Sequence, residues 1–219
     1  MSLMKGRLFI IGASGHGRVV ADCAAALNRW TDIAFFDDRH PELDRNLKWP
    51  VRGNVASITE TADSKDEIFV AIGNCAARLA MLTRFRQMGL KLATLVHPHA
   101  SVSPDTKIEC GSIVVAGAVV NIGTTVGLGG IINTGSSVDH DCVLQSGVHI
   151  CPGARLAGNV HVGDRSWIGI GAAVRQGVQI GSDVVVGAGA AVVTDVPDGL
   201  TVVGVPARPL ARGQDNQGS

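Results

Sequence analysis

The densest group of side chains that could do chemistry lies between residues 133 and 142 of the 219-residue chain. His140 stands there between Asp139 and Asp141, and Cys142 follows. A neighbouring carboxylate orients an imidazole and makes it more basic, so this pattern is typical of a general base. Two alternatives stay open: a solvated histidine without a catalytic role, and Cys142 as a nucleophile that carries an acyl group.

A second candidate site is the glycine loop at residues 12–17, with the sequence GASGHG. It joins an apolar stretch, residues 7–12, to a helical stretch, residues 18–27. Such a loop presents backbone N–H groups and the positive end of a helix to an anion. Ser14 stands where redox dinucleotide sites have their middle glycine, so the spacing disfavours NAD. A tight turn without any ligand is the alternative.

Alternating strands and helices surround that loop. The expected strands are residues 7–12, 33–36, 67–72 and 92–96, and the expected helices are residues 18–27 and 76–88. This order predicts a small parallel sheet, a Rossmann-like α/β domain over residues 1–96. Asp37 and Asp38 end the second strand some 20 residues beyond the loop, where contacts to a ribose or a base usually arise. These carboxylates favour a bound nucleotide.

The second half of the chain is a repeat with a period of six residues. Every sixth residue is Val, Ile or Leu: Val102, Ile108, Val114, Val120, Val126, Ile132, Val138, Leu144, Ile150, Leu156, Val162, Ile168, Val174, Ile180, Val186 and Val192. Neither a helix nor simple alternation has this period, whereas a strand with a corner every six residues does. Three such faces close an 18-residue coil, so residues 97–208 are expected to form a left-handed parallel β-helix around these side chains. Residues 209–219 are expected to be a flexible tail.

Glycine often follows the inward aliphatic residue directly, where a tight corner is expected, as at Gly127, Gly163, Gly169, Gly181 and Gly187. A prism filled by side chains leaves little interior space for a ligand. Its chemistry should therefore lie in grooves between identical copies, and a homotrimer is the expected assembly.

The repeat also bears on the alternatives for the polar segment. Cys142 falls at an inward position, which disfavours a nucleophile. His140, His149 and His161 are nine and twelve residues apart and fall on different faces of the coil, so a metal site is not expected.

Composition excludes several classes of protein. The chain has 19 basic and 19 acidic residues, so it has no excess charge with which to neutralise nucleic-acid phosphates. No apolar run approaches the ~20 residues of a membrane span. Five scattered cysteines without a C-x-x-C pair favour a reduced, cytoplasmic protein.

Over nearly its whole length the chain resembles one family. The resemblance rests on the hexapeptide run together with the segments IIGASGHGRVV, FFDD, VAIGN, NTGSSVDHDC and VGVPAR. The family comprises the sugar O- and N-acetyltransferases of the hexapeptide-repeat acyltransferases. It includes sialic acid O-acetyltransferases and the nucleotide-diphospho-4-amino-sugar N-acetyltransferases of bacillosamine and perosamine pathways. The resemblance implies acetyl-CoA as co-substrate, no metal, and active sites between the subunits of a homotrimer.

The resemblance also implies a role for individual residues. His140 matches the catalytic base, and Asp141 matches the acidic residue after it, which is Glu in several relatives. Matches to the acetyl-CoA site are His149, Gly158, Gly187 and Arg208. Matches to the nucleotide-sugar site are Gly12, Ser14, Gly15, His16, Asp37, Asp38, Asn74 and Asn133.

The function implied first is N-acetylation of the 4-amino group of a nucleotide-linked (UDP or GDP) 4-amino-4,6-dideoxy sugar for a surface glycan, by direct transfer from acetyl-CoA. O-acetylation of sialic acid or a related sugar is an alternative within the family. A nucleotide-sugar-binding scaffold without turnover is an alternative from another class, and the intact His140–Asp141 pair disfavours it.

Overall fold

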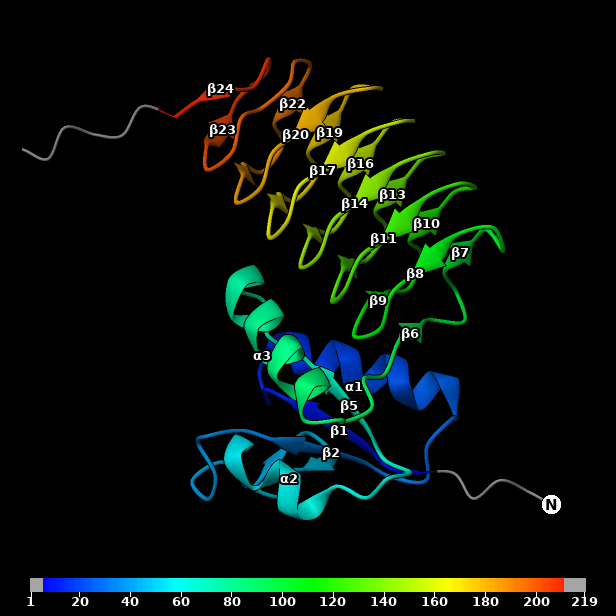
Figure 1. Cartoon of the computed structure of the whole chain (residues 1–219), viewed down its shortest axis with the longest axis vertical. Helices are drawn as coiled ribbons and strands as arrows, with labels where there is room; N and C mark the ends of the chain where they lie inside the picture. Colours follow the sequence, from blue (N-terminus) through cyan, green and yellow to red (C-terminus); the bar gives the residue numbers. More distant parts are fainter. Residues whose placement is uncertain (1–5, 211–219) are drawn as a thin grey trace, which may run out of the picture.

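The computed structural model describes residues 6–210, which form two units stacked along the long axis of the molecule (Figure 1). The first unit is the predicted α/β unit. Its parallel sheet has the order β2-β1-β5, with β1 (Leu8–Ile11), β2 (Ile33–Phe36) and β5 (Glu67–Val70). Helices α1 (Gly15–Leu27) and α3 (Cys75–Gln87) begin and end within three residues of the predicted ranges. The sequence analysis missed four short elements: β3 (Arg45–Asn46), β4 (Trp49–Pro50), the 3-10 turn η1 (Val55–Ser57) and α2 (Ile58–Thr61).

The strands of this unit are apolar throughout because both faces of the sheet are covered. On one face, Ile10 belongs to a buried cluster with α1 and with Ile113 and Ile131 of the second unit. On the other face, Ile11 packs in a cluster with α2 and with Leu82 of α3. Figure 1 shows α1 between the sheet and the second unit, and α2 on the far side of the sheet. The two units therefore share a core.

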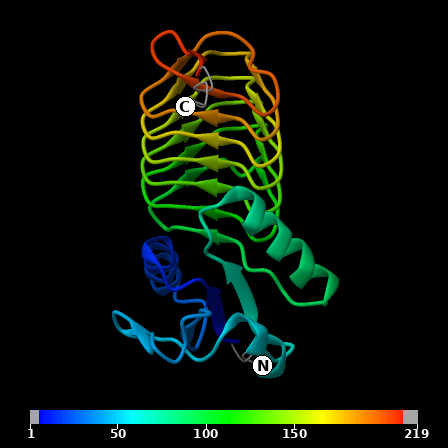
Figure 2. The same cartoon turned by 90° about the vertical axis from the view of Figure 1, so that its left-hand side faces the viewer.

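The second unit is the predicted parallel β-helix, with sheets on three faces (Figure 2). Face 1 contains β6 (Leu95–Val96), β9 (Ile113–Val114), β12 (Ile131–Ile132), β15 (His149–Ile150), β18 (Trp167–Ile168), β21 (Val185–Val186), β23 (Thr201–Val203) and β24 (Arg208–Pro209). Face 2 contains β7 (Ser101–Val102), β10 (Val119–Val120), β13 (Ser137–Val138), β16 (Arg155–Leu156), β19 (Ala173–Val174) and β22 (Ala191–Val192). Face 3 contains β8 (Lys107–Ile108), β11 (Thr125–Val126), β14 (Val143–Leu144), β17 (His161–Val162) and β20 (Gln179–Ile180).

The register of these strands confirms the 18-residue coil. Val120 of β10 pairs with Val102 below it and with Val138 above it, and the other faces repeat this step. The aliphatic residues of the period point inward and form one continuous cluster from Val114 to Val202. The second residue of each two-residue strand therefore fills the prism, while the first faces outward.

The junction between the units differs from the prediction by a few residues. The sequence predicts one strand at 92–96 in the α/β sheet, but only Leu92 reaches that sheet, through a bridge to Ile68. Leu95 and Val96 instead form β6 and pair with β9 on face 1. The first rung of the prism thereby satisfies its backbone groups before the regular period begins.

The upper end of the prism also differs from the prediction. The expected tail begins at residue 209, but Pro209 pairs with Val202, and the Leu210 N–H donates to the Thr201 carbonyl at 2.7 Å. These two residues belong to an antiparallel cap over the last coil, and residues 211–219 lie outside the described residues.

The prediction that glycine directly after the inward residue makes the corner is wrong. The residue with left-handed backbone is the third one after the inward residue. Ten glycines with φ between 63° and 76° occupy this position: Gly111, Gly117, Gly123, Gly129, Gly135, Gly147, Gly153, Gly171, Gly177 and Gly189. The five predicted corner glycines have ordinary φ, but each lacks room for a Cβ. At Gly163 a Cβ would lie 2.5 Å from backbone atoms of Gly181 and Ser182. These glycines let successive coils approach closely.

Two alanine substitutions in one corner separate the requirement for left-handed backbone from the requirement for close approach between coils. Gly171→Ala places a Cβ in open space at φ 65°, so it should cost about 1 kcal/mol of stability. Gly169→Ala collides with the Val186 carbonyl of the next coil and should cost about 3 kcal/mol. Urea unfolding of both variants measures the difference, and an equal loss for the two would contradict the close-approach explanation.

Candidate active site

His140 lies in the corner between face 2 and face 3, directly after β13. Its Nδ1 is 2.9 Å from Asp141 Oδ2, so the aspartate, although shorter than glutamate, reaches the ring. A carboxylate only accepts hydrogen bonds, so Nδ1 carries the proton and Nε2 of the neutral ring is free to accept one. Asp141 has φ 58°, the left-handed position of this corner. The side chains of His140 and Asp141 are 57% and 68% exposed, so a substrate can reach them.

Two glycines of neighbouring coils leave the space that this pair occupies. A Cβ on Gly158, 18 residues after His140, would lie 2.5 Å from His140 Nε2. A Cβ on Gly123, 18 residues before Asp141, would collide with the Asp141 carboxylate. The Gly158 N–H has no hydrogen-bond partner within residues 6–210. A free backbone donor therefore lies beside the nitrogen that accepts a proton.

The electrostatics of the corner favour a base. The hydrogen bond that the His140 ring donates to Asp141 raises the pKa of His140 above its ordinary value, and the charges of Asp139 and Asp141 add to the effect. Asp139 is held in place because Asn121 Nδ2 donates to its Oδ1 at 2.7 Å. The His140 backbone N–H donates to the same oxygen at 3.0 Å.

The glycine loop connects β1 to α1 as predicted. Gly12 has φ 101°, and a Cβ on Gly17 would collide with the Gly12 carbonyl, so these two glycines are explained by the tight turn. The tight turn does not explain Gly15, because a Cβ at Gly15 would meet nothing within 4 Å. Ser14 occupies the N-cap of α1 without a side-chain hydrogen bond, and the first turn contains no acidic residue. The positive end of α1 is therefore available to an anion.

The two aspartates after β2 have different surroundings. Asp37 binds Arg39 through two contacts of 2.8 and 2.9 Å and accepts from the Ala13 N–H at 2.8 Å, and these bonds depress its pKa strongly. It therefore holds the glycine loop in place. Asp38 accepts from the Val55 N–H at 2.9 Å and lines a cavity of about 240 Å³ between α2 and α3. Asp38 is the better placed of the two to contact a ligand.

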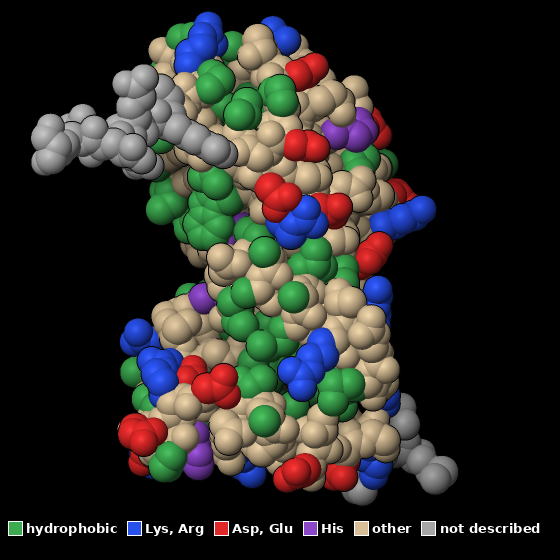
Figure 3. All heavy atoms as spheres, turned by 60° about the vertical axis from the view of Figure 1, so that its left-hand side comes forward, with side chains coloured by type: hydrophobic (Ala, Val, Ile, Leu, Met, Phe, Trp, Pro, Cys, Tyr) green, Lys and Arg blue, Asp and Glu red, His purple; other side chains and the backbone are tan. Residues whose placement is uncertain are grey.

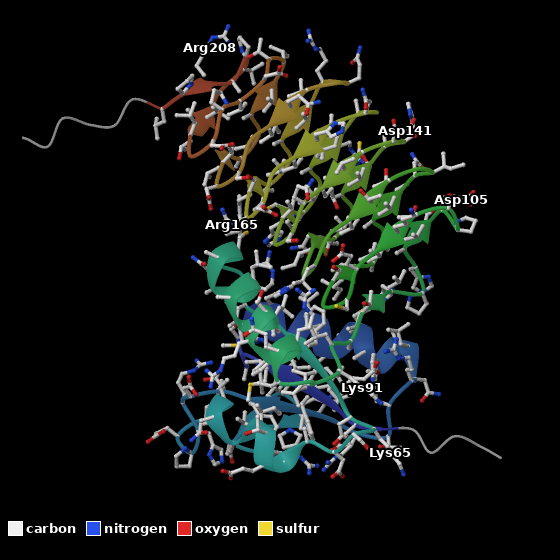
Figure 4. All side chains as sticks on the ribbon, viewed as in Figure 1. Lys65, Lys91, Asp105, Asp141, Arg165 and Arg208 are labelled. Atoms are coloured by element: carbon white, nitrogen blue, oxygen red, sulfur yellow. The ribbon has the colours of Figure 1, made fainter. Side chains whose placement is uncertain are left out.

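Asn74 caps the helix that follows β5. Its side-chain oxygen accepts from the Ala77 N–H at 2.9 Å. It also lines a cavity of about 410 Å³ between the start of α3 and face 1, where Trp167 and the Arg165–Asp183 ion pair form the opposite wall. Arg165 projects toward α3 in Figure 4.

A second histidine cluster lies between the two units. His149 of β15 is 5% exposed, its Nε2 is 3.1 Å from Asn133 Nδ2, and its ring centroid is 4.2 Å from that of Trp167. The His16 ring of the glycine loop is 6.4 Å away. Burial and the nearby Arg78 charge lower the pKa of His149 to about 3 and that of His16 to about 4. Both rings are neutral at physiological pH.

The structure therefore brings most of the predicted residues together, but not into one site. The glycine loop, Asn74, Asn133 and His149 meet at the waist between the units, where Figure 3 shows the molecule narrowed and hydrophobic side chains gathered. Asp141, beside His140, projects from the edge of the prism opposite to that of Arg165 (Figure 4).

The remaining acetyl-CoA candidates lie higher on the prism. Gly187 is on face 1 below β23, and its N–H donates to the Val202 carbonyl at 2.8 Å. Arg208 is exposed at the top of the molecule (Figure 4) and lines a cavity of about 210 Å³ under the cap.

The sequence analysis missed Trp167 and Arg78 at the waist, and Arg39, which binds Asp37 and the glycine loop. For Trp167 a signal existed, because the outward residue of face 1 is apolar in most coils, as at Ile113, Ile131 and Val185. A repeated apolar position on the outside of one face indicates that something covers it. For the two arginines no pattern in the sequence distinguishes them from solvated charges.

Other side chains bear on the alternatives. Cys142 is fully buried, and burial raises its pKa. Within residues 6–210 no group of three or more His, Cys, Asp or Glu side chains could hold a metal ion. None of the helices in this part of the chain is long and apolar enough to cross a membrane.

Comparison with known proteins agrees with this architecture. The family model of the PglD N-terminal domain matches residues 7–85, and that of the bacterial transferase hexapeptide (six repeats) matches residues 159–193. The acetyltransferase domain of PglB from Neisseria gonorrhoeae FA1090 is 45% identical, with a TM-score of 0.91. The match covers 93% of this chain and 99% of that domain, which has also been solved with acetyl coenzyme A.

Two further relatives carry the name of a nucleotide sugar. PerB from Caulobacter crescentus, solved in complex with CoA and GDP-perosamine, is 38% identical with a TM-score of 0.87 over 96% of this chain and 100% of that chain. GDP-perosamine N-acetyltransferase of Escherichia coli O157:H7 is 35% identical over 148 residues, which are 65% of this chain and 67% of that protein.

An α/β unit docked on a left-handed β-helix, with relatives that match both parts, defines an acetyl-CoA-dependent acyltransferase of the hexapeptide-repeat class. Within that class the chain belongs to the family of the nucleotide-sugar N-acetyltransferases. The predicted fold and family are therefore confirmed.

The Asp141 carboxylate should set the basicity of His140. Asp141→Asn removes the negative charge and leaves only a weaker, neutral acceptor, so the pKa of His140 should fall toward its ordinary value. NMR titration of the imidazole measures this shift. Asp183→Asn, which breaks the Arg165 ion pair on another corner, is the matched control. An unchanged titration of His140 in Asp141→Asn would refute the assignment.

Proposed function

We propose that this protein transfers the acetyl group of acetyl-CoA to the 4-amino group of a UDP- or GDP-linked 4-amino-4,6-dideoxy sugar, with His140 as general base. The observation that carries the proposal is the His140–Asp141 pair, which leaves Nε2 free beside the unpaired N–H of Gly158. The names of the relatives from Caulobacter crescentus and Escherichia coli O157:H7 support the amino-sugar acceptor.

The chemistry follows from these groups. The amino group of the sugar is mostly ammonium at neutral pH, so it must lose a proton before it attacks the thioester. Solvent takes up that first proton, and His140 Nε2 accepts the second proton from the nitrogen as it attacks the thioester carbon, while Asp141 stabilises the imidazolium that forms. The Gly158 N–H donates to the oxyanion of the tetrahedral intermediate, which contributes roughly 3–4 kcal/mol. The CoA thiolate leaves and takes up the proton.

Direct transfer fits the surroundings better than an acetyl-enzyme. Cys142, the cysteine nearest in sequence to His140, is buried, and its Sγ contacts the Ala157 carbonyl at 3.2 Å. Positioning of two bound substrates replaces covalent catalysis in such a ternary complex. A burst of acetylated protein in the absence of sugar would contradict this mechanism.

The sugar of the acceptor is assigned to the waist, and its nucleotide part to the α/β unit. The open N-terminus of α1 at Ser14 and Gly15 takes the diphosphate, and Asp38 contacts the nucleoside. Acetyl-CoA is assigned to a groove between two prisms, with its thioester near His149 and Gly158 and its adenine end near Gly187 and Arg208.

A homotrimer completes the site, because one chain keeps its base away from its acceptor residues. The His140 corner and the His149 cluster lie on different sides of the prism. The exposed Ile122, 18 residues before His140, and the exposed Ile170 on another corner offer apolar surface to neighbouring copies. The net charge of zero gives no reason to expect nucleic acid as a partner, and five unpaired cysteines support a cytoplasmic location.

A panel of acceptors tests the proposal. Acetyl-CoA is offered with UDP- and GDP-linked 4-amino sugars, with the corresponding 4-hydroxy sugars and with free sialic acid, and thiol release is followed. We expect turnover with a nucleotide-linked 4-amino sugar. Turnover only with sialic acid would establish O-acetylation instead, and binding of nucleotide sugar without turnover would indicate a scaffold.

His140→Ala is the control for the same assay. Removal of the base should lower kcat by about 10²–10⁴-fold, while binding of acetyl-CoA, measured by calorimetry, is retained. Gln176→Ala, an exposed residue at the equivalent corner position two coils above His140, should leave kcat unchanged. Near-normal turnover of His140→Ala would remove this residue from the mechanism.

Subunit mixing tests whether the site is shared. His140→Ala and His149→Gln should each be impaired, yet co-expressed subunits with different tags should regain about one third of wild-type turnover, because one interface per mixed trimer has both histidines. Purification through both tags isolates the mixed species. No gain over the parent variants would show that both residues act within one chain.

A further inference from the structure

Arg78 of α3 is fully buried, and its guanidinium donates hydrogen bonds to four backbone carbonyls. Nη1 donates to the carbonyls of Ile72 and Gly73, both at 2.9 Å. Nε donates to the Gly129 carbonyl at 2.9 Å, and Nη2 donates to the Gly147 carbonyl at 2.7 Å. The four carbonyls belong to two different units of the molecule.

The burial of this charge is costly. No carboxylate within residues 6–210 forms an ion pair with Arg78, and burial lowers its pKa below the ordinary value. A methionine of similar length would fill the same space without the desolvation penalty of an unpaired cation, but it would leave the four carbonyls without this donor. A role beyond packing is therefore needed to explain an arginine here.

The positions of the four carbonyls show which segments the guanidinium holds together. Ile72 and Gly73 form the turn after β5, directly before Asn74. Gly129 and Gly147 stand in the same corner of two successive coils, two residues before the outward residues Ile131 and His149. One side chain thus fixes the spacing between the loops at the waist and the strand that carries His149.

We propose that Arg78 is a positioning residue that sets the distance between the two units at the acceptor site. The proposal rests on the proposed function, because that site is the one assigned there to the nucleotide sugar. Arg78 touches neither reacting atom. It acts through the loop at Gly73 and through the two neutral histidines of the waist.

Those histidines supply the second observation. His149 Nδ1 and His16 Nε2 are buried and have no hydrogen-bond partner within the described part of the chain. His149 Nε2 accepts from Asn133, so Nδ1 carries the proton of the neutral ring and is a donor. Two unpaired nitrogens on rings 6.4 Å apart are available to a polar atom of a bound substrate.

Burial keeps these rings neutral, and the charge of Arg78 adds to its effect. After burial, this charge is the next cause that lowers the pKa of both His16 and His149. Cys75 is the other titratable group that faces Arg78, and Cys151 lies near Cys75. With Arg78 charged, protonation of either histidine would add a second cation to a dry interface, so His149 remains a neutral donor over the working pH range.

Arg78→Met and Arg78→Lys separate the contribution of the Arg78 charge from that of its hydrogen bonds. Met removes both the charge and the hydrogen bonds, whereas Lys keeps the charge but cannot reach all four carbonyls. Arg86→Met, an exposed arginine on the same helix, is the matched control. Each variant is made in the full chain and compared by histidine NMR titration, acetyl-CoA binding and kinetics with the sugar that the wild type accepts.

We expect the pKa values of His16 and His149 to rise in Arg78→Met and to stay unchanged in Arg78→Lys and Arg86→Met. We expect kcat/KM for the sugar to fall about 10²-fold in Arg78→Met and about tenfold in Arg78→Lys, with acetyl-CoA affinity within twofold of wild type. If Arg78→Met does not fold, kcat/KM of Arg78→Lys for the sugar tests the positioning role.

Wild-type kcat/KM in Arg78→Lys, or unmoved histidine titrations in a folded Arg78→Met, would overturn the proposal and leave a structural arginine. The titration uses no substrate. If the wild type acetylates no amino sugar, the proposed function fails while the coupling between Arg78 and the histidines is still measured.

Discussion

The 18-residue register of the coil is the constraint on which the rest of the structure depends. Each inward aliphatic side chain stacks on the one a full coil away, and the backbone of every rung bonds to the rung above it. A corner residue therefore lies between the same corner positions of its two neighbouring coils. This stacking places His140 above Ile122 and below Gly158, and an insertion of one residue would destroy both relations at once.

The same register explains why an exposed pair of side chains has a defined geometry. His140 and Asp141 protrude from a corner, where most side chains change rotamers freely. Here the missing side chains of Gly158 and Gly123 leave room for one arrangement, and Asp141 holds the ring through Nδ1. Rigid neighbouring coils thus orient the base, and no surrounding loop is required.

The sequence predicted the repeat, the inward residues and the main α/β elements because each follows from a short-range period or from composition. It also indicated His140, whose partner Asp141 is adjacent in the chain. The sequence could not predict the contacts between the two units at the waist. The contacts of Arg78 join residues 51 and 69 positions apart, and the proximity of His16 to His149 depends on how two units dock. The corner glycines were misassigned because close approach and left-handed backbone both select glycine, and sequence alone does not separate them.

His140 and His149 lie in two different environments, which shift their pKa values in opposite directions. At the exposed corner, carboxylates raise the pKa of His140, whereas burial beside Arg78 lowers the pKa of His149. A base and a neutral donor need such opposite surroundings. A single prism cannot supply both in one place, since its interior is filled by aliphatic side chains and its corners are open to water. The proposed trimer would bring the corner of one copy against the waist of another and so join the two environments, and for this reason our proposal places the chemistry in the assembly rather than in the single chain.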